Sequence, residues 1–102
     1  MGWFIKTEKF TDQTQAKSIS ERRFYIEKHR EWVQLLKSSG HIIYSGYLVN
    51  RNHLPGGGGL LILKADSFTQ AEDLIKKDPM IVFELVEWEI QEWVTMSKEL
   101  FN

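Results

Sequence analysis

The stretch from residue 20 to residue 38 constrains the fold more than any other part of the sequence. Its apolar side chains recur at helical spacing and form one stripe. The stripe consists of Tyr25, Ile26, Trp32, Val33 and Leu36. His29 lies inside this stripe, one helical turn after Tyr25 and one before Trp32. We therefore expect a long amphipathic helix that points a titratable ring at the surface on which it packs.

Residues before and after this helix have the composition of strands, with one more helix among them. The predicted strands are residues 3–10, 41–49, 60–65 and 82–95. The second helix begins at Ser67, where Gln70 follows at the spacing of a capping box, and it ends at Asp78, because Pro79 cannot continue it. Residues 11–19 and 50–59 are expected to be loops, and residues 96–102 a short tail.

Both ends of the first helix carry suitable capping residues. Ser18 or Ser20 is a suitable N-cap, and Gly40 suits the left-handed position after the last turn. The element order is then β-α-β-β-α-β, the ferredoxin-like α+β arrangement, with a four-stranded antiparallel sheet and two helices on one face. A length of 102 residues predicts a single domain over residues 1–102.

Apolar residues on the second face of the predicted sheet indicate a homodimer. A sheet with one face in water should alternate between apolar and polar residues. The strand Leu60–Leu63 is apolar on both faces, and Trp3 and Phe4 point in opposite directions. Two helices cover only one face, so a second copy of the chain is expected to cover the other. The alternative is that sheet twist and residues 50–59 cover it within one chain.

Composition excludes several classes of function. The formal net charge is −1 and no basic stripe is present, which argues against nucleic-acid binding. The chain has no cysteine, so thiolate chemistry and disulfides are excluded. No apolar run approaches the roughly 20 residues that span a bilayer, and the N-terminus lacks the pattern of a signal peptide. We therefore expect a cytoplasmic protein that does not bind membranes.

Neither a metal nor a cofactor is predicted. The histidines and the glutamates of the last strand lack HxxxH or HxH spacing, and charge that protects a sheet edge explains these glutamates more simply. The glycine run 56–59 leads into a strand and lacks the spacing of a phosphate-binding loop. It is expected to be a mobile hairpin loop, such as a lid over a site.

His29 and Asp78 are the candidate catalytic residues. An imidazole is suited to general acid–base work near neutral pH, although a histidine in an apolar stripe is also a common core residue. Asp78 ends the second helix, where the helix dipole disfavours a carboxylate, so a cationic partner is expected. If both helices lie on one sheet face, Asp78 can approach His29 and fix its tautomer. The alternative for Asp78 is a turn residue.

The small-molecule ligand is expected to meet basic and small side chains. Arg22 or Arg23 is a candidate partner for an acidic substrate, although a solvated helix face also explains arginines there. Tyr44, Ser45 and Gly46 are expected to line the pocket.

The sequence resembles the YciI-like (YCII-related) family along nearly its whole length. The matching pieces are Trp3-Phe4-Ile5, the helix His29-x-x-Trp32-x-x-Leu35, Ser45-Gly46, the glycine-rich turn, Ser67-x-x-x-Ala71, Asp78-Pro79 and the strand 85–90 leading to Trp93. The chain departs from the family pattern at Tyr47, Glu84 and Glu92, where proline, glycine and proline are common.

This resemblance implies a dimeric α/β barrel whose active site is a His–Asp pair, at His29 and Asp78 here. Some relatives resemble lyases or dehydrohalogenases acting on lactones and small organic acids. The leading hypothesis is therefore a cofactor-independent, lyase- or isomerase-like enzyme in which His29 removes a proton and Asp78 orients it. The alternative is a non-catalytic binding or accessory homodimer with a structural His–Asp pair. Fold analogy adds a weaker option, a monooxygenase-like role.

Overall fold

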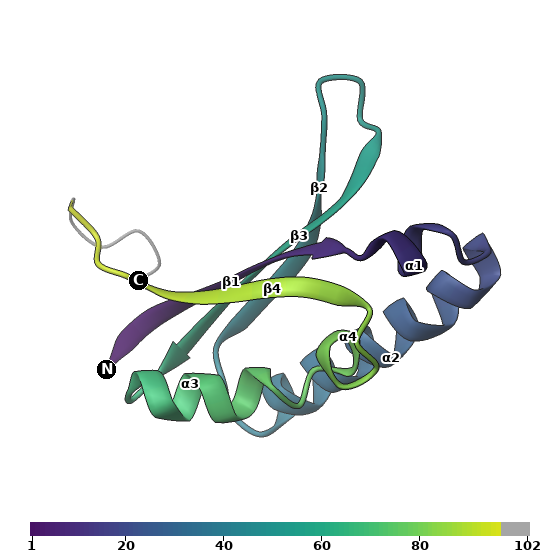
Figure 1. The fold of residues 1–102 in the computed structure, drawn as a ribbon. Helices are drawn as coiled ribbons and strands as arrows, with labels where there is room; N and C mark the ends of the chain where they lie inside the picture. Colours follow the sequence, from purple (N-terminus) through teal and green to yellow (C-terminus); the bar gives the residue numbers. More distant parts are fainter. Residues whose placement is uncertain (97–102) are drawn as a thin grey trace.

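A four-stranded antiparallel sheet with the strand order β2-β3-β1-β4 carries the fold (Figure 1). The computed structural model describes residues 1–96. Its strands are β1 Gly2–Phe10, β2 Ile43–Val49, β3 Pro55–Ala65 and β4 Val86–Trp93. Its helices are α1 Asp12–Gln15, α2 Ile19–Ser38, α3 Phe68–Ile75 and α4 Pro79–Val82. The predicted α+β, ferredoxin-like order is confirmed, with α1 and α4 as short additions. The predicted tail, apart from Met96, lies outside the described residues.

The helices cover one face of the sheet, where the main core forms (Figure 1). The register of β1, β3 and β2 sets Phe4, Leu63 and Ile43 side by side on this face, and all three are buried. Val33 and Leu36 of α2 pack on them, together with residues of α3. The apolar stripe predicted for the first helix is therefore the surface that contacts the sheet, which brings His29 over the strands.

Capping residues fix both ends of α2. The Ser18 hydroxyl accepts a hydrogen bond from the Glu21 N–H, so Ser18 rather than Ser20 is the N-cap. After the helix, Gly40 has a φ of +94°, a left-handed conformation that glycine adopts without strain. His41 then donates its N–H to the Leu36 carbonyl, which ties the start of the next segment to the last turn.

The glycine run is part of a strand, and the prediction of a loop over residues 50–59 is wrong for its second half. β3 begins at Pro55, and Gly58 and Gly59 pair with Lys9 and Glu8 of β1. Glycine is depleted in strands, which is why the sequence indicated a loop. The glycine run therefore belongs to strand β3 and is not a separate hairpin loop.

The sequence predicted neither of the two short helices. α1 lies in the predicted loop 11–19, and α4 lies between the predicted second helix and last strand and overlaps that strand only at Val82. In α1, Thr14 is buried and donates its hydroxyl hydrogen to the Leu85 carbonyl at 2.7 Å, which ties this turn to the segment before β4. α4 follows Asp78, so β4 begins at Val86 rather than at Val82. Neither helix is long enough to produce a periodic apolar pattern in the sequence.

The sheet face away from the helices carries half-buried apolar side chains. The register aligns Ile5, Ile62 and Tyr44 across three strands on this face, with Trp3 and Leu60 beside them. Tyr44 exposes 51% of its surface. Among the described helices, none has the length and apolarity that crossing a bilayer requires.

Candidate active site

His29 bridges a buried carboxylate and an exposed hydroxyl. Its Nδ1 lies 2.8 Å from Oδ1 of Asp78, and its Nε2 lies 2.7 Å from Oγ of Ser45. A carboxylate only accepts hydrogen bonds, so Nδ1 carries a hydrogen and donates it to Asp78. In the neutral ring Nε2 is then the acceptor, and Ser45 donates to it. Helix α2 carries His29 and strand β2 carries Ser45. Together they direct Nε2, the nitrogen that can accept a proton, toward the exposed Ser45 side chain.

Asp78 is fully buried and accepts hydrogen bonds from three groups. Besides His29, the Lys6 ammonium donates to Oδ2 at 2.6 Å and the Met80 N–H donates to Oδ1 at 3.0 Å. Asp78 is the N-cap of α4, with Pro79 at the first helical position. The prediction that Asp78 ends the second helix is therefore wrong, because α3 already ends at Ile75. The local dipole favours its negative charge instead of opposing it.

The environment of Asp78 keeps this carboxyl ionised. Burial removes water from the carboxylate and on its own raises the pKa. The hydrogen bond from His29 and the charge of Lys6 outweigh that effect, so the pKa of Asp78 lies below its usual value of 3.8. An acceptor that is charged at neutral pH therefore lies behind the His29 ring.

Lys6 and Glu8 extend this polar cluster. Lys6 lies on the central strand β1 with an exposure of only 1%, and its ammonium group pairs with Glu8 as well as with Asp78. Glu8 fits there because Gly59 lies opposite it, and a Cβ on Gly59 would approach the Glu8 Cγ to 3.0 Å. Sequence reasoning missed both residues. Side chains along β1 point alternately to the two faces of the sheet, so Lys6 shares the buried face with Phe4. That pattern could have identified Lys6 from the sequence.

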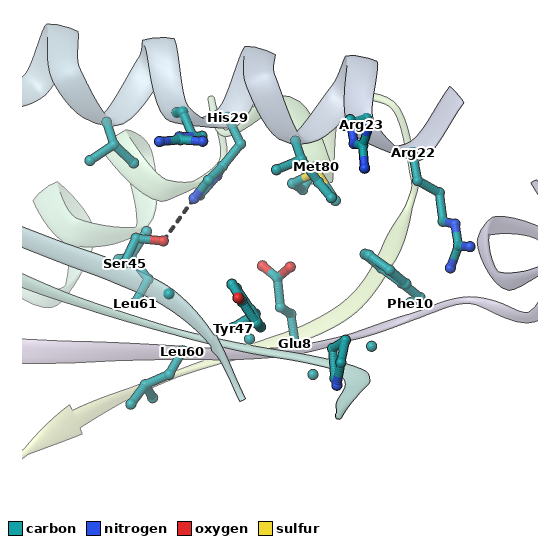
Figure 2. A pocket seen from close by; sticks show the side chains of 18 of the residues that line it. Glu8, Phe10, Arg22, Arg23, His29, Ser45, Tyr47, Leu60, Leu61 and Met80 are labelled. Atoms are coloured by element: carbon teal, nitrogen blue, oxygen red, sulfur yellow. Dashed lines mark hydrogen bonds between the residues drawn. The ribbon is translucent and has the colours of Figure 1, made fainter. Parts of the chain in front are cut away.

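An open cleft of about 880 Å³ lies between α2 and the strands (Figure 2). His29, Glu8 and Ser45 line it, and the close-up shows the carboxylate of Glu8 and the ring of His29 pointing into the same space. Apolar side chains form much of the remaining wall, among them Phe10, Ile26, Val33, Leu61 and Met80. Such a mixture is typical of sites for small molecules.

The structure brings most of the predicted site residues together. Arg22, Arg23 and Gly46 line the cleft with His29 and Ser45, and Asp78 lies directly behind His29. Tyr44 does not belong to this set, so its prediction as a lining residue is wrong. Successive strand residues point to opposite faces, and Tyr44 therefore aligns with Ile62 and Ile5 on the face away from the helices. Within residues 1–96, no cluster of three His, Asp or Glu side chains is arranged to hold a metal ion.

The fold and the cleft define a small α+β protein of ferredoxin-like topology with a buried Asp–His pair at the edge of a ligand-sized cavity. The profile of the YCII-related domain matches residues 6–94. The chain belongs to the family of YCII-related domain proteins.

A solved structure has the same fold. It is 5-chloro-2-hydroxyhydroquinone dehydrochlorinase (TftG) from Burkholderia phenoliruptrix AC1100, in complex with 2,5-dihydroxybenzoquinone. The two chains are 18% identical, the TM-score is 0.66, and the match covers 90% of this chain and 93% of the other. No curated protein matches the sequence.

Proposed function

We propose that this protein is a small-molecule enzyme in which His29 removes a proton from a substrate in the cleft, leading to elimination or isomerisation. The observation that carries the proposal is the orientation of His29, whose Nδ1 is held by a buried carboxylate while its Nε2 faces the cleft side. A base must lie within hydrogen-bond reach of the proton it removes. A substrate that displaces the Ser45 hydroxyl from Nε2 would place its acidic C–H there.

Asp78 has two roles in this proposal. It holds the tautomer in which Nε2 is free of hydrogen, and it stabilises the imidazolium ion that forms when Nε2 takes the proton. The lowered pKa of Asp78 supports both roles, since the carboxyl stays charged at neutral pH.

Charge in the cleft favours an anionic substrate, such as a small organic acid. The basic side chains that line it are Arg22, Arg23, Arg30 and Lys37, against one acid, Glu8, which shares the Lys6 ammonium with Asp78. The Nε of Arg22 is buried and has no hydrogen-bond partner within residues 1–96. An arginine with a donor to spare is well suited to a carboxylate or an acidic hydroxyl of the substrate.

The named activity of the structural neighbour agrees with this chemistry. A dehydrochlorinase removes the elements of HCl, and loss of a proton to a base is one half of that reaction. At 18% identity the neighbour establishes only the fold.

Deuterium exchange tests the proposed proton abstraction. A panel of unsaturated lactones, keto acids and chlorinated hydroquinones is incubated with the protein in D2O, and loss of C–H signals or release of chloride is followed by NMR and an ion electrode. We expect exchange or elimination for at least one compound. His29→Gln should slow it ~10²-fold or more, the usual contribution of a general base. His53→Asn, in an exposed turn with left-handed backbone that asparagine tolerates, is the matched control and should react normally.

The alternative is a binding or accessory protein in which His29 and Asp78 are a structural pair. The burial of Lys6 beside them favours it, because buried ion clusters also occur for structural reasons. The two proposals differ in what His29→Gln changes. An unfolding free energy that falls by several kcal/mol, with no exchange in the wild-type protein, would select the structural pair.

A further inference from the structure

Ser45, His29 and Asp78 form a continuous hydrogen-bonded series whose geometry is that of a nucleophilic triad. The Ser45 hydroxyl contacts Nε2 of His29 at 2.7 Å, and Nδ1 of the same ring contacts Asp78 at 2.8 Å. Both distances lie within the range at which a base accepts a proton from a nucleophile and a third group orients the base. Such a triad is recognised by its geometry and not by its order in the sequence.

The exposure of each side chain suits its place in such a triad, as nucleophile, base or orienting carboxylate. Asp78 has no exposed surface, the His29 side chain is 15% exposed, and Ser45 is exposed and lines the cleft. The nucleophile is therefore the member that a ligand reaches, and the orienting carboxylate is the member furthest from water. We propose that Ser45 is a nucleophile and that the cleft also hydrolyses small carboxylic esters, open or cyclic.

The backbone at Ser45 supplies a donor for the oxyanion that such a reaction forms. Lys64 donates its N–H to the Ile42 carbonyl at 3.0 Å, so residues 42 and 64 are a hydrogen-bonded pair of the ladder. Pairs alternate along antiparallel strands, so Ser45, opposite Leu61, directs its N–H away from β3. β2 is an edge strand, so no strand within residues 1–96 pairs with it on that side. In serine proteases the N–H of the nucleophile itself is one of the two oxyanion donors.

The reaction balances with water as the only co-reactant. The Ser45 Oγ attacks the ester carbonyl carbon while its proton moves to Nε2 of His29. The C–O bond to the alcohol then breaks, and the alcohol oxygen takes the proton from Nε2. Water attacks the acyl-Ser45 ester, passes a proton to Nε2, and that proton returns to Oγ as the carboxylic acid leaves.

A fluorophosphonate probe tests the nucleophile without knowledge of the natural substrate. Attack by Oγ forms a P–O bond, releases fluoride and sends the proton to His29. Intact-mass and peptide mass spectrometry should find one adduct per chain, on Ser45, and none in Ser45→Ala. His29→Gln should lower the rate of labelling ~10²-fold or more if His29 is the base. The matched control is Ser38→Ala, an exposed serine at the end of α2, which should label at the wild-type rate.

Ester turnover is measured with p-nitrophenyl acetate on the same variants and should fall in Ser45→Ala but not in Ser38→Ala. The proposal is overturned by an absence of adduct, by an adduct on another residue, or by Ser45 labelling at an unchanged rate in His29→Gln. The inference rests on the proposed role of His29 as a base. The two proposals can nevertheless fail separately. Deuterium exchange that persists in Ser45→Ala supports His29 as the base of the proposed function, and the labelling experiment decides whether Ser45 is a nucleophile.

Discussion

Lys6 is a charged residue at the centre of the sheet, and its partners explain how it is accommodated there. Its ammonium group contacts Asp78 and Glu8, and its side chain is 1% exposed. Lys6→Met would leave two carboxylates near one another without their cation, so we expect the unfolding free energy to fall by about 3–5 kcal/mol. Urea unfolding at neutral pH measures this change. Lys9→Met, at an exposed position of the same strand, should change stability by less than about 0.5 kcal/mol.

Asp78 links stability to pH. The pKa of Asp78 in the folded protein lies below its usual value of 3.8. As the pH falls, the Asp78 carboxyl is therefore protonated in the unfolded chain before it is protonated in the folded protein. The stabilisation that ionised Asp78 supplies is therefore complete above about pH 4 and is lost as the pH falls through the lower, folded-state pKa. Asp78→Asn should be less stable than wild type at pH 7, and the difference should narrow in more acidic solution. Urea unfolding of both proteins at a series of pH values tests this, and a constant difference down to acid-induced unfolding would contradict it.

The residues of the site were not equally predictable from the sequence. The helical spacing of α2 placed His29 correctly on the side that faces the sheet. Two helices on one face made a contact with Asp78 possible, and the family resemblance singled it out, although Asp78 begins α4 instead of ending the second helix. Lys6 was missed because lysine is almost never fully buried. Tyr44 was misplaced because strand alternation had not been applied to two neighbouring residues, Tyr44 and Ser45.

At the scale of elements, the glycine-rich start of β3 depends on glycine at one position in particular. Gly57 has a φ of +78°, and a Cβ there would lie 2.7 Å from the Gln15 side chain and 3.3 Å from the ring of Phe10. Gly57→Ala should therefore lower the unfolding free energy by about 1–2 kcal/mol. Gly56→Ala is the matched control, because no heavy atom lies within 4 Å of its added Cβ. Thermal unfolding measures the stability of both variants. Equal stability of Gly57→Ala and Gly56→Ala would contradict the prediction and show that β3 tolerates a side chain at Gly57.

Long periodic elements were predicted well and short ones were not. The stripe of α2 and the alternation of β1 set their positions, since each buries a continuous face. α4 has four residues and no repeat, although an aspartate before a proline is itself a typical helix start. That short helix matters for the site, because its first turn donates the Met80 N–H to the carboxylate of Asp78.

At the scale of the whole molecule, the helices lie on one side of the sheet, and no helix or strand within residues 1–96 covers the other side (Figure 1). The cleft lies on the helix side. The site residues come from α2, β1, β2 and the turn before α4, so the cleft depends on the packing of the helices onto the strands. A partner on the opposite face would therefore leave the Asp78–His29–Ser45 series in place.

A second copy of the chain is the partner that we propose for that face. Ile5, Ile62 and Tyr44 align across it, and covering their remaining apolar surface is worth about 25 cal/mol per Å². Light scattering after size-exclusion chromatography should give twice the mass of the chain for the wild-type protein. Ile62→Glu would place a charge at the centre of the interface and should give the monomer mass. Leu35→Glu, on the exposed side of α2, is the control and should remain dimeric. A monomeric wild type, or dissociation by Leu35→Glu and not by Ile62→Glu, would reject the sheet face as the interface between copies.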